Sequence, residues 1–367
     1  MKTATAHRQL AVRQGRGTLC SIMLMIVAAP GAADADIITD WNAIAASAVA
    51  ARGPSASLVD LAIVHAAIYD SVNAIDLGHQ VYKVEPGSPS DGASQEAAAA
   101  AAAHRTLVGL FPAQAATLDA AFATSLAAIA DGPAKTRGIA LGQEVAVGIL
   151  ALRADDGRNR VVPYVFGTGP GVYQRTPPPY PPTGQPVLTF LPHVTPMVLQ
   201  SPWQFRAYGP PGLGSAVYTR DLKEVRELGS LVSTVRTDAQ TETARFHTEN
   251  PTLFWNRNLG NLVASRNLGT ARSARLMALL AFAQADSVIA CFDSKYAYNF
   301  WRPHTAITQA DTDGNPATAA DPVWLAIVRR RRIPSTRLRT VASQAPLPRP
   351  CACSSGRGKS SSRSTAR

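Results

Sequence analysis

The segment LVDLAIVHAAIYDSVNAI, residues 58–75, decides the fold class that we predict for this chain. Apolar side chains recur throughout it at helical spacing, and the run is too long for an ordinary strand. Gly78 follows shortly after its end, where glycine commonly terminates a helix. The segment is therefore predicted to be a long, buried α-helix.

Helical patterns continue on both sides of this segment. The first half of the chain has three more predicted helical regions: 41–51 with Asp40 as N-cap, an Ala-rich stretch at 95–130 broken near Phe111-Pro112, and 136–154. The second half has four, at 221–235, 238–247, 259–268 and 271–292. No alternating strand pattern and no repeat of about 20–50 residues accompanies them. The predicted fold is all-α, a multi-helix bundle.

A proline-rich stretch separates the two helical halves. Thirteen of the 27 prolines fall between Pro163 and Pro211, which excludes a long helix. We predict a long ordered loop over the helical body, although an extended spacer between domains is the alternative. The aromatic residues expected to anchor the loop are Tyr164, Phe166, Tyr173, Tyr180, Phe190, Trp203 and Phe205.

Two histidines lie inside predicted helices, His65 and His104. Neither has other metal-ligating residues at suitable spacing, so we expect hydrogen-bonded core or interface histidines rather than ligands. The sequence also lacks a glycine-rich phosphate loop, the HExxH and GxSxG motifs, and a CxxC pair. No metal site is predicted.

One segment does carry a chemical signal, DSKYAYNFWRPH at residues 293–304. Lys295 and Arg302 are seven residues apart, which in a continuous helix places them on nearly the same face. Pro303 marks the end of that helix or a kink. Two permanent cations among aromatic residues suit a tetrahedral oxyanion, whereas a solvated cationic face is the structural alternative. Asp293 is interpreted as a helix-surface acid in preference to a partner of Lys295.

The spacing Lys295-x6-Arg302-Pro303 resembles the first signature of the vanadium-dependent haloperoxidase and type-2 phosphatidic acid phosphatase superfamily. Four segments resemble the bacterial haloperoxidase-like branch of this superfamily. They are DSKYAYNFWRPHTAI from Asp293, ITDWNAIA from Ile38, LAIVHAAIYDSVNAI from Leu61 and PYVFGTGPGVY from Pro163. The resemblance covers roughly residues 36–328. It implies a helical bundle in which Lys295 and Arg302 bind vanadate, or phosphate in a phosphatase.

The resemblance also implies two later signatures that bear histidines, Pro-Ser-x-His and an Arg followed by a His. The chain has seven histidines and His304 is the last, adjoining the first signature without occupying either expected place. No catalytic residue is therefore assigned. The expected activity is peroxide-driven halide oxidation at bound vanadate, with this chain catalytically deficient. The alternatives are phosphate-ester hydrolysis and a non-catalytic helical protein with oxyanion affinity.

The overall charge of +11 and the pI near 9.9 would suit a nucleic-acid or membrane partner, but the charge is confined to the ends. Residues 329–367 hold ten Arg, one Lys and no acid, whereas residues 36–328 carry a net −3. We therefore expect no specific nucleic-acid partner. The expected partners are a small oxyanion, peroxide and halide, with a homodimer possible.

Residues 1–35 are predicted to be a signal peptide. A basic region extends from Lys2 to Arg16 and is followed by an apolar run. Ala33-Asp34-Ala35 then fits a cleavage site. The mature protein is then periplasmic or secreted, without a transmembrane anchor; an uncleaved N-terminal anchor is the alternative.

Residues 329–367 are predicted to be a disordered basic tail or an out-of-frame product, following an incomplete domain at 36–328. The gene can be read in a shifted frame that begins at the third base of the Val328 codon. With GC-favoured codons, this frame can encode the peptide APPPHPEYPS[A/T]HG. That string contains the Pro-Ser-x-His signature which the resemblance implies. A natural basic tail that binds anionic surfaces is the alternative.

Overall fold

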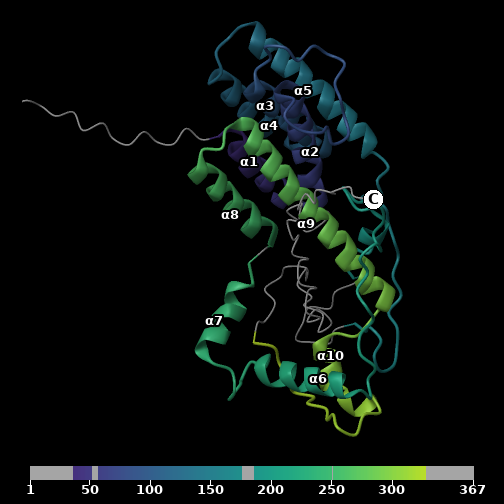
Figure 1. Cartoon of the computed structure of the whole chain (residues 1–367). Helices are drawn as coiled ribbons and strands as arrows, with labels where there is room; N and C mark the ends of the chain where they lie inside the picture. The colour runs from purple at the N-terminus through teal and green to yellow at the C-terminus, as the bar shows by residue number, and fades with distance from the viewer. Residues whose placement is uncertain (1–35, 52–56, 176–185, 250, 328–367) are drawn as a thin grey trace, which may run out of the picture. The chain divides into compact units, whose positions relative to one another are not determined.

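A computed structural model describes residues 36–51, 57–175, 186–249 and 251–327. The described residues form α-helices joined by loops and contain no strand, only two isolated β-bridges (Figure 1). This confirms the all-α prediction. The chain divides into Met1–Ala35 and Asp36–Arg367, and only the second unit contains described residues. The predicted signal peptide and the tail at 329–367 lie outside the described residues.

Ten α-helices are present in the described part of the chain. They are α1 Ile37–Ala51, α2 Ser57–Asp76, α3 Gln95–Leu110, α4 Ala115–Ala127, α5 Pro133–Leu152, α6 Ala216–Leu228, α7 Asp238–Phe246, α8 Pro251–Arg266, α9 Thr270–Tyr298 and α10 Pro303–Thr308. Most agree with the predicted regions to within a few residues. The largest differences are at α8, which begins eight residues earlier than predicted, and at α6, which covers 216–228 instead of 221–235.

Helix α2 is the centre of the bundle, as its apolar sequence predicts. It packs against α3, α5 and α9, and Ile63 and Ile68 are fully buried. By length and hydropathy alone, two described helices could cross a membrane, α2 over Leu58–Asp76 and α9. In α2 most of this apolar surface is covered by neighbouring helices.

Small residues let α3 and α5 approach closely. Ala97 to Ala103 form a continuous buried run in α3, and Gly138 and Gly142 face it from α5. A Cβ on Gly142 would lie 2.3 Å from the carbonyl oxygen of Ala98, a distance that real side chains do not adopt. Glycine at this position is therefore required by helix contact.

Of two predicted helix boundaries, one differs in the structure and one is confirmed. Helix α1 begins at Ile37, and Asp36 supplies the cap because its carboxylate accepts a hydrogen bond from the Ile38 amide at 3.1 Å. The prediction of Asp40 as N-cap is therefore wrong, since Asp40 lies inside the first turns. The break predicted near Phe111-Pro112 is confirmed: α3 and the following helical segment are bent by 118°.

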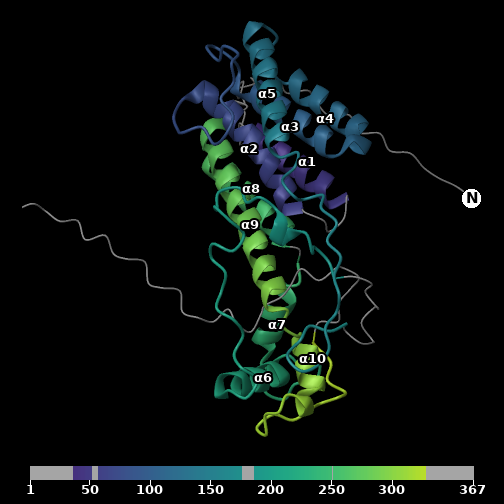
Figure 2. The same ribbon diagram turned by 90° about the vertical axis from the view of Figure 1, so that its right-hand side faces the viewer.

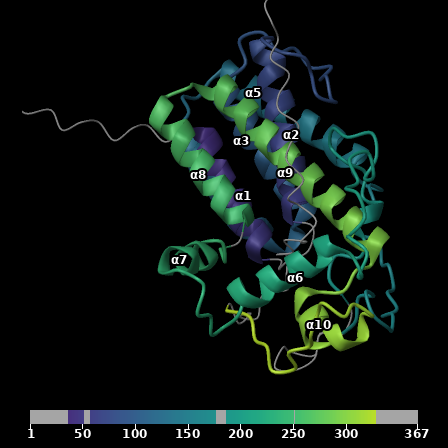
Figure 3. The same cartoon turned by 60° about the horizontal axis from the view of Figure 1, so that its bottom comes forward.

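Helix α9 connects the bundle with a smaller hydrophobic cluster (Figures 1 and 2). Its first half packs against α2, and α8 lies beside α1 and α9 (Figure 3). Beyond its last turn, α10 packs against α6. This second cluster contains buried Tyr218, Leu222, Trp301, Ala306, Ile307, Ala310 and Trp324.

Candidate oxyanion site

The two predicted site cations lie on either side of the turn between α9 and α10. Lys295 is in the last turn of α9, Asn299 adopts a left-handed conformation with φ of 48°, and Arg302 is the extended N-cap residue of α10. The prediction that Lys295 and Arg302 share one helix face is therefore wrong. Helical geometry is disfavoured for Arg302 because it precedes a proline, whereas proline is favoured at the first position of a helix, where Pro303 lies. The helix consequently ends before Arg302.

A glycine-containing loop pairs with this turn through backbone hydrogen bonds. The Tyr173 amide donates to the Asn299 carbonyl at 2.8 Å, and the Trp301 amide donates to the Gly171 carbonyl at 3.0 Å. Gly171 has φ of 78°, which favours glycine at this position. Two segments quoted for the family resemblance, 163–173 and 293–307, are thus brought together.

Each predicted site cation lies near an aromatic ring. The Lys295 Nζ is 3.9 Å from the ring centroid of Phe292, and the Arg302 guanidinium carbon is 5.4 Å from the centroid of Tyr173. Cations within about 6 Å of a ring are attracted to its face. Phe292 is in the same helix as Lys295, but Tyr173 comes from the proline-rich loop. The loop therefore contributes directly to the surroundings of Arg302.

Tyrosines from the loop and from α9 extend this aromatic environment. The rings of Tyr164 and Tyr296 lie 5.7 Å apart, and those of Tyr164 and Tyr173 lie 5.9 Å apart. Burial raises the pKa of Tyr296 well above its ordinary value, so its phenol stays protonated. Its hydroxyl donates to the Val187 carbonyl at 2.7 Å. Tyr296 thus adds no negative charge to this aromatic cluster.

The interpretation of Asp293 as a helix-surface acid is wrong. Asp293 is buried, and both of its oxygens accept hydrogen bonds from Arg206, at 2.7 Å from Nε and 2.8 Å from Nη2. The bidentate pair ties the proline-rich loop to the last turns of α9. Sequence reasoning missed Arg206 because nothing in its local sequence signals a partner 87 residues away.

A second carboxylate fixes the same loop further along α9. Asp286 accepts hydrogen bonds from three consecutive backbone amides, Met197, Val198 and Leu199, at 2.6–2.9 Å. Asp286 and Asp293 are seven residues apart in one helix and so project from nearly the same face. Together they attach residues 197–206 to α9.

The predicted ordered loop is confirmed for its described parts. Tyr164, Phe166, Tyr173 and Phe190 pack as anchors, whereas Trp203 and Phe205 are 60% and 69% exposed and do not. The hydrogen bonds that Asp286 accepts and that Arg206 donates hold that section instead, which explains why aromatic burial is not needed there. Tyr180 lies outside the described residues.

The histidines in the described part of the chain do not form a metal centre. His65 is fully buried with its Nε2 3.0 Å from Asn42 Oδ1, and His104 Nε2 lies 2.7 Å from Asp119 Oδ1. Both are hydrogen-bonded core or interface residues, as predicted. His304 packs edge-on against Trp324 with 6.1 Å between ring centroids, and burial lowers its pKa. A neutral imidazole therefore adjoins the site at pH 7.

Comparison with protein families gives a match in this region. Residues 275–337 match the model of the VCPO second helical-bundle domain, a range that contains Lys295 and Arg302. The match covers 63 of the 367 residues, so the resemblance to this domain concerns that segment of the chain. The match continues past Val328, so its last residues fall in the predicted tail and outside the described structure.

Solved structures show that the chain shares its fold with bacterial enzymes. A bacterial vanadium-dependent iodoperoxidase aligns with a TM-score of 0.61 and 21% identity, over 77% of this chain and 75% of the other. A bacterial vanadium-dependent chloroperoxidase aligns at 16% identity, with TM-scores of 0.53 for its apo form and 0.54 for its holo form. The chain spans 64% and 66% of those two chains. By sequence, no curated protein is significantly similar.

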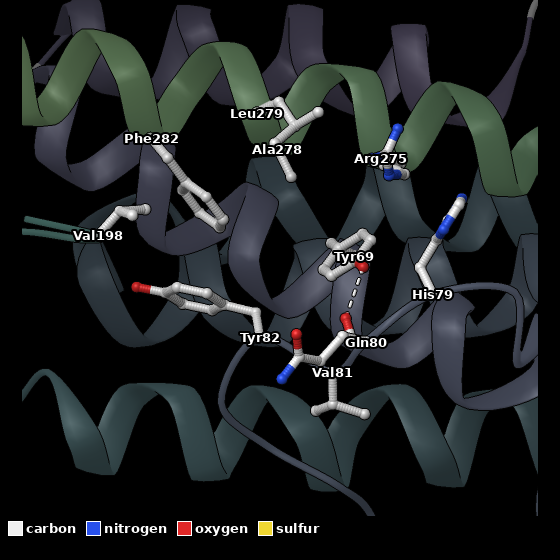
Figure 4. A pocket seen from close by; sticks show the side chains of 10 residues that line it. All are labelled: Tyr69, His79, Gln80, Val81, Tyr82, Val198, Arg275, Ala278, Leu279 and Phe282. Carbon is white, nitrogen blue, oxygen red and sulfur yellow. Dashed lines mark hydrogen bonds between the residues drawn. The ribbon is translucent and has the colours of Figure 1, made fainter. Parts of the chain in front are cut away.

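A surface cleft of about 400 Å³ lies elsewhere on the chain, along the first half of α9 (Figure 4). Its lining residues are Tyr69, His79, Gln80, Val81, Tyr82, Val198, Arg275, Ala278, Leu279 and Phe282. Arg275 and Lys295 are twenty residues apart in one helix, about 30 Å at the usual helical rise. The cleft and the predicted oxyanion site are therefore separate.

Proposed function

We propose that the 367-residue chain binds a tetrahedral oxyanion such as vanadate at the α9–α10 turn. The observation that carries this proposal is the placement of Lys295 and Arg302 at one short turn, clamped by the glycine-containing loop. Lys295 supplies a compact charge, and Arg302 supplies a planar fork of donors. The nearest acid in sequence, Asp293, accepts two hydrogen bonds from Arg206.

The donor set fits an oxyanion, but it is incomplete for the family reaction. Bound vanadate would supply the centre that activates peroxide for halide oxidation. That chemistry would also need a nitrogen ligand and an acid–base group, and no histidine follows His304 in this sequence. We therefore propose that this polypeptide binds the oxyanion while lacking halide-oxidising turnover.

The test combines a binding measurement with two activity assays on the full chain. We expect vanadate to bind in equilibrium dialysis, with no vanadate-dependent oxidation of iodide or bromide by peroxide above a blank. Turnover that requires added vanadate would refute the proposed deficiency. Cleavage of a phosphate ester that vanadate inhibits would instead support the phosphatase alternative, because both classes use the same type of oxyanion cage.

We also propose that the protein is exported and acts in the periplasm or outside the cell. The basic start, the apolar run and the A-x-A site support this proposal. N-terminal sequencing of protein purified from a bacterial host should begin at Asp36. A start at Met1 with membrane-bound protein would indicate the uncleaved anchor. The possible homodimer stays a prediction for sedimentation measurements.

A further inference from the structure

The geometry points to a second binding site, in the cleft beside the first half of α9, for a small amphipathic carboxylate. Its volume of about 400 Å³ lies in the usual range for small-molecule sites. The site is separate from the oxyanion site and does not depend on the function proposed for it.

Buried polar contacts fix two walls of this cleft. Asp70 accepts hydrogen bonds from the amides of Tyr82, Lys83 and Val84 at 2.7–3.0 Å, which holds the Tyr82 wall against α2. Asp286 holds the Val198 wall against α9 in the same way. Burial raises the pKa of Asp70, and the three backbone hydrogen bonds oppose this shift. The buried carboxylate thus holds residues 82–84 in place.

One further hydrogen bond joins these walls, and another holds the Tyr82 wall to α2. The Tyr82 hydroxyl donates to the Met197 carbonyl at 2.6 Å, and the Tyr69 hydroxyl donates to the Gln80 carbonyl at 2.7 Å. The cleft is therefore built before any ligand arrives, which lowers the entropic cost of binding. Both phenolic protons are used in these contacts, so the tyrosines offer a ligand acceptor oxygens only.

The basic side chains of the cleft lie toward one end. Figure 4 shows Arg275 and His79 near each other, with Val198 and Phe282 at the opposite end. No lining residue is acidic, and Arg275 forms no salt bridge with another described residue. A guanidinium in such a position prefers a carboxylate, which it can bind through two parallel hydrogen bonds.

The opposite end calls for an apolar group on the same ligand. Phe282 and Ala278 form its floor, while Val198 and Leu279 remain 66% and 50% exposed at its rim. A phenyl or short alkyl group would cover this exposed apolar area. An apolar body with one terminal carboxylate therefore matches both ends of the cleft.

The test uses 4-phenylbutyrate and its uncharged analogue 4-phenylbutan-1-ol with the full chain. Calorimetry or saturation-transfer NMR should show saturable binding of the acid. Arg275→Gln should weaken it about tenfold, because a charge-assisted hydrogen bond is lost, and should leave the alcohol unaffected. Arg272→Gln is the matched control, since Arg272 is an exposed arginine of α9 outside the cleft.

A second variant keeps the result interpretable if Arg275→Gln disturbs the helix. Leu279→Glu places a negative charge at the exposed rim and should abolish binding of the acid, with helix content unchanged by circular dichroism. Absence of saturable binding of 4-phenylbutyrate at millimolar concentration would overturn the proposal. Equal binding of acid and alcohol, or unchanged binding by Arg275→Gln, would overturn the assignment of a carboxylate.

Discussion

The bundle around α2 is held together by packed apolar helices, whereas the α9–α10 turn is held by hydrogen bonds from a loop. In the bundle, α3 and α5 approach so closely that glycine is needed at Gly142. At the turn, the contacts are the Tyr173 and Trp301 amides and the pair between Arg206 and Asp293. The bundle therefore determines global stability, and the loop determines the geometry of the oxyanion site.

This difference predicts that the two regions respond to different perturbations. Changes in the bundle should lower the free energy of unfolding of the whole chain. Changes at the turn should alter oxyanion affinity with less effect on stability, because Tyr173 and Arg302 are only partly buried and lie outside the core of the bundle.

The largest expected effect concerns the bundle and pH. Burial lowers the pKa of His65 to about 4, below its ordinary value of 6.5, so the unfolded state binds the proton more readily. Stability contributed by neutral His65 is complete above pH 6.5 and is lost as pH falls toward 4, by up to about 3 kcal/mol. Urea unfolding at several pH values measures this loss.

The control for this prediction is His65→Gln, which keeps a donor for Asn42 but does not titrate. It should show a smaller loss of stability between pH 7 and pH 4.5. An identical pH dependence in both proteins would show that His65 is not the titrating group. Oxyanion affinity at pH 7 should be the same in both.

The next effect tests helix contact in the bundle. Gly142→Ala should destabilise the chain by about 2 kcal/mol, because its Cβ would clash with the Ala98 carbonyl. Gly260→Ala is the matched control, since a Cβ on Gly260 in α8 meets nothing within 4 Å. That control should stabilise the chain by about 0.5–1 kcal/mol, because alanine favours helices over glycine. Equal effects would contradict the close α3–α5 contact.

The smallest effect tests the loop at the oxyanion site. Tyr173→Leu removes the ring beside Arg302 and should weaken vanadate binding about two- to fivefold. Tyr173→Phe keeps the ring and should bind like the wild type. Thermal unfolding of both variants should change little. If Tyr173→Leu unfolds the chain without a separate affinity change, the proposed division between bundle and loop is wrong.

The helical fold was predictable because its signals are local. Apolar periodicity located α2, and a proline after Phe111 located the bend between α3 and α4. Details that depend on neighbouring atoms were less accessible. The N-cap of α1 is Asp36 instead of Asp40, a choice between two acids that composition cannot make.

The site was predictable in part. The family resemblance points to Lys295 and Arg302, but the sequence does not give their placement, because Pro303 begins a new helix instead of ending the old one. The partners Arg206 and Tyr173 lie far away in sequence and are joined by a loop without regular periodicity. The glycines of 167–171 were the available signal for the Tyr173 side of the site.

The most direct measurement is a calorimetric titration of orthovanadate into the full chain and into Arg302→Gln. Arg175→Gln serves as the matched control, because Arg175 lies over the Phe166 ring, 5.1 Å from its centroid, and is not a predicted ligand. We expect the wild type and Arg175→Gln to bind alike and Arg302→Gln to bind at least about tenfold more weakly. Equal affinity of all three proteins, or no binding by the wild type, would contradict an oxyanion site at the α9–α10 turn.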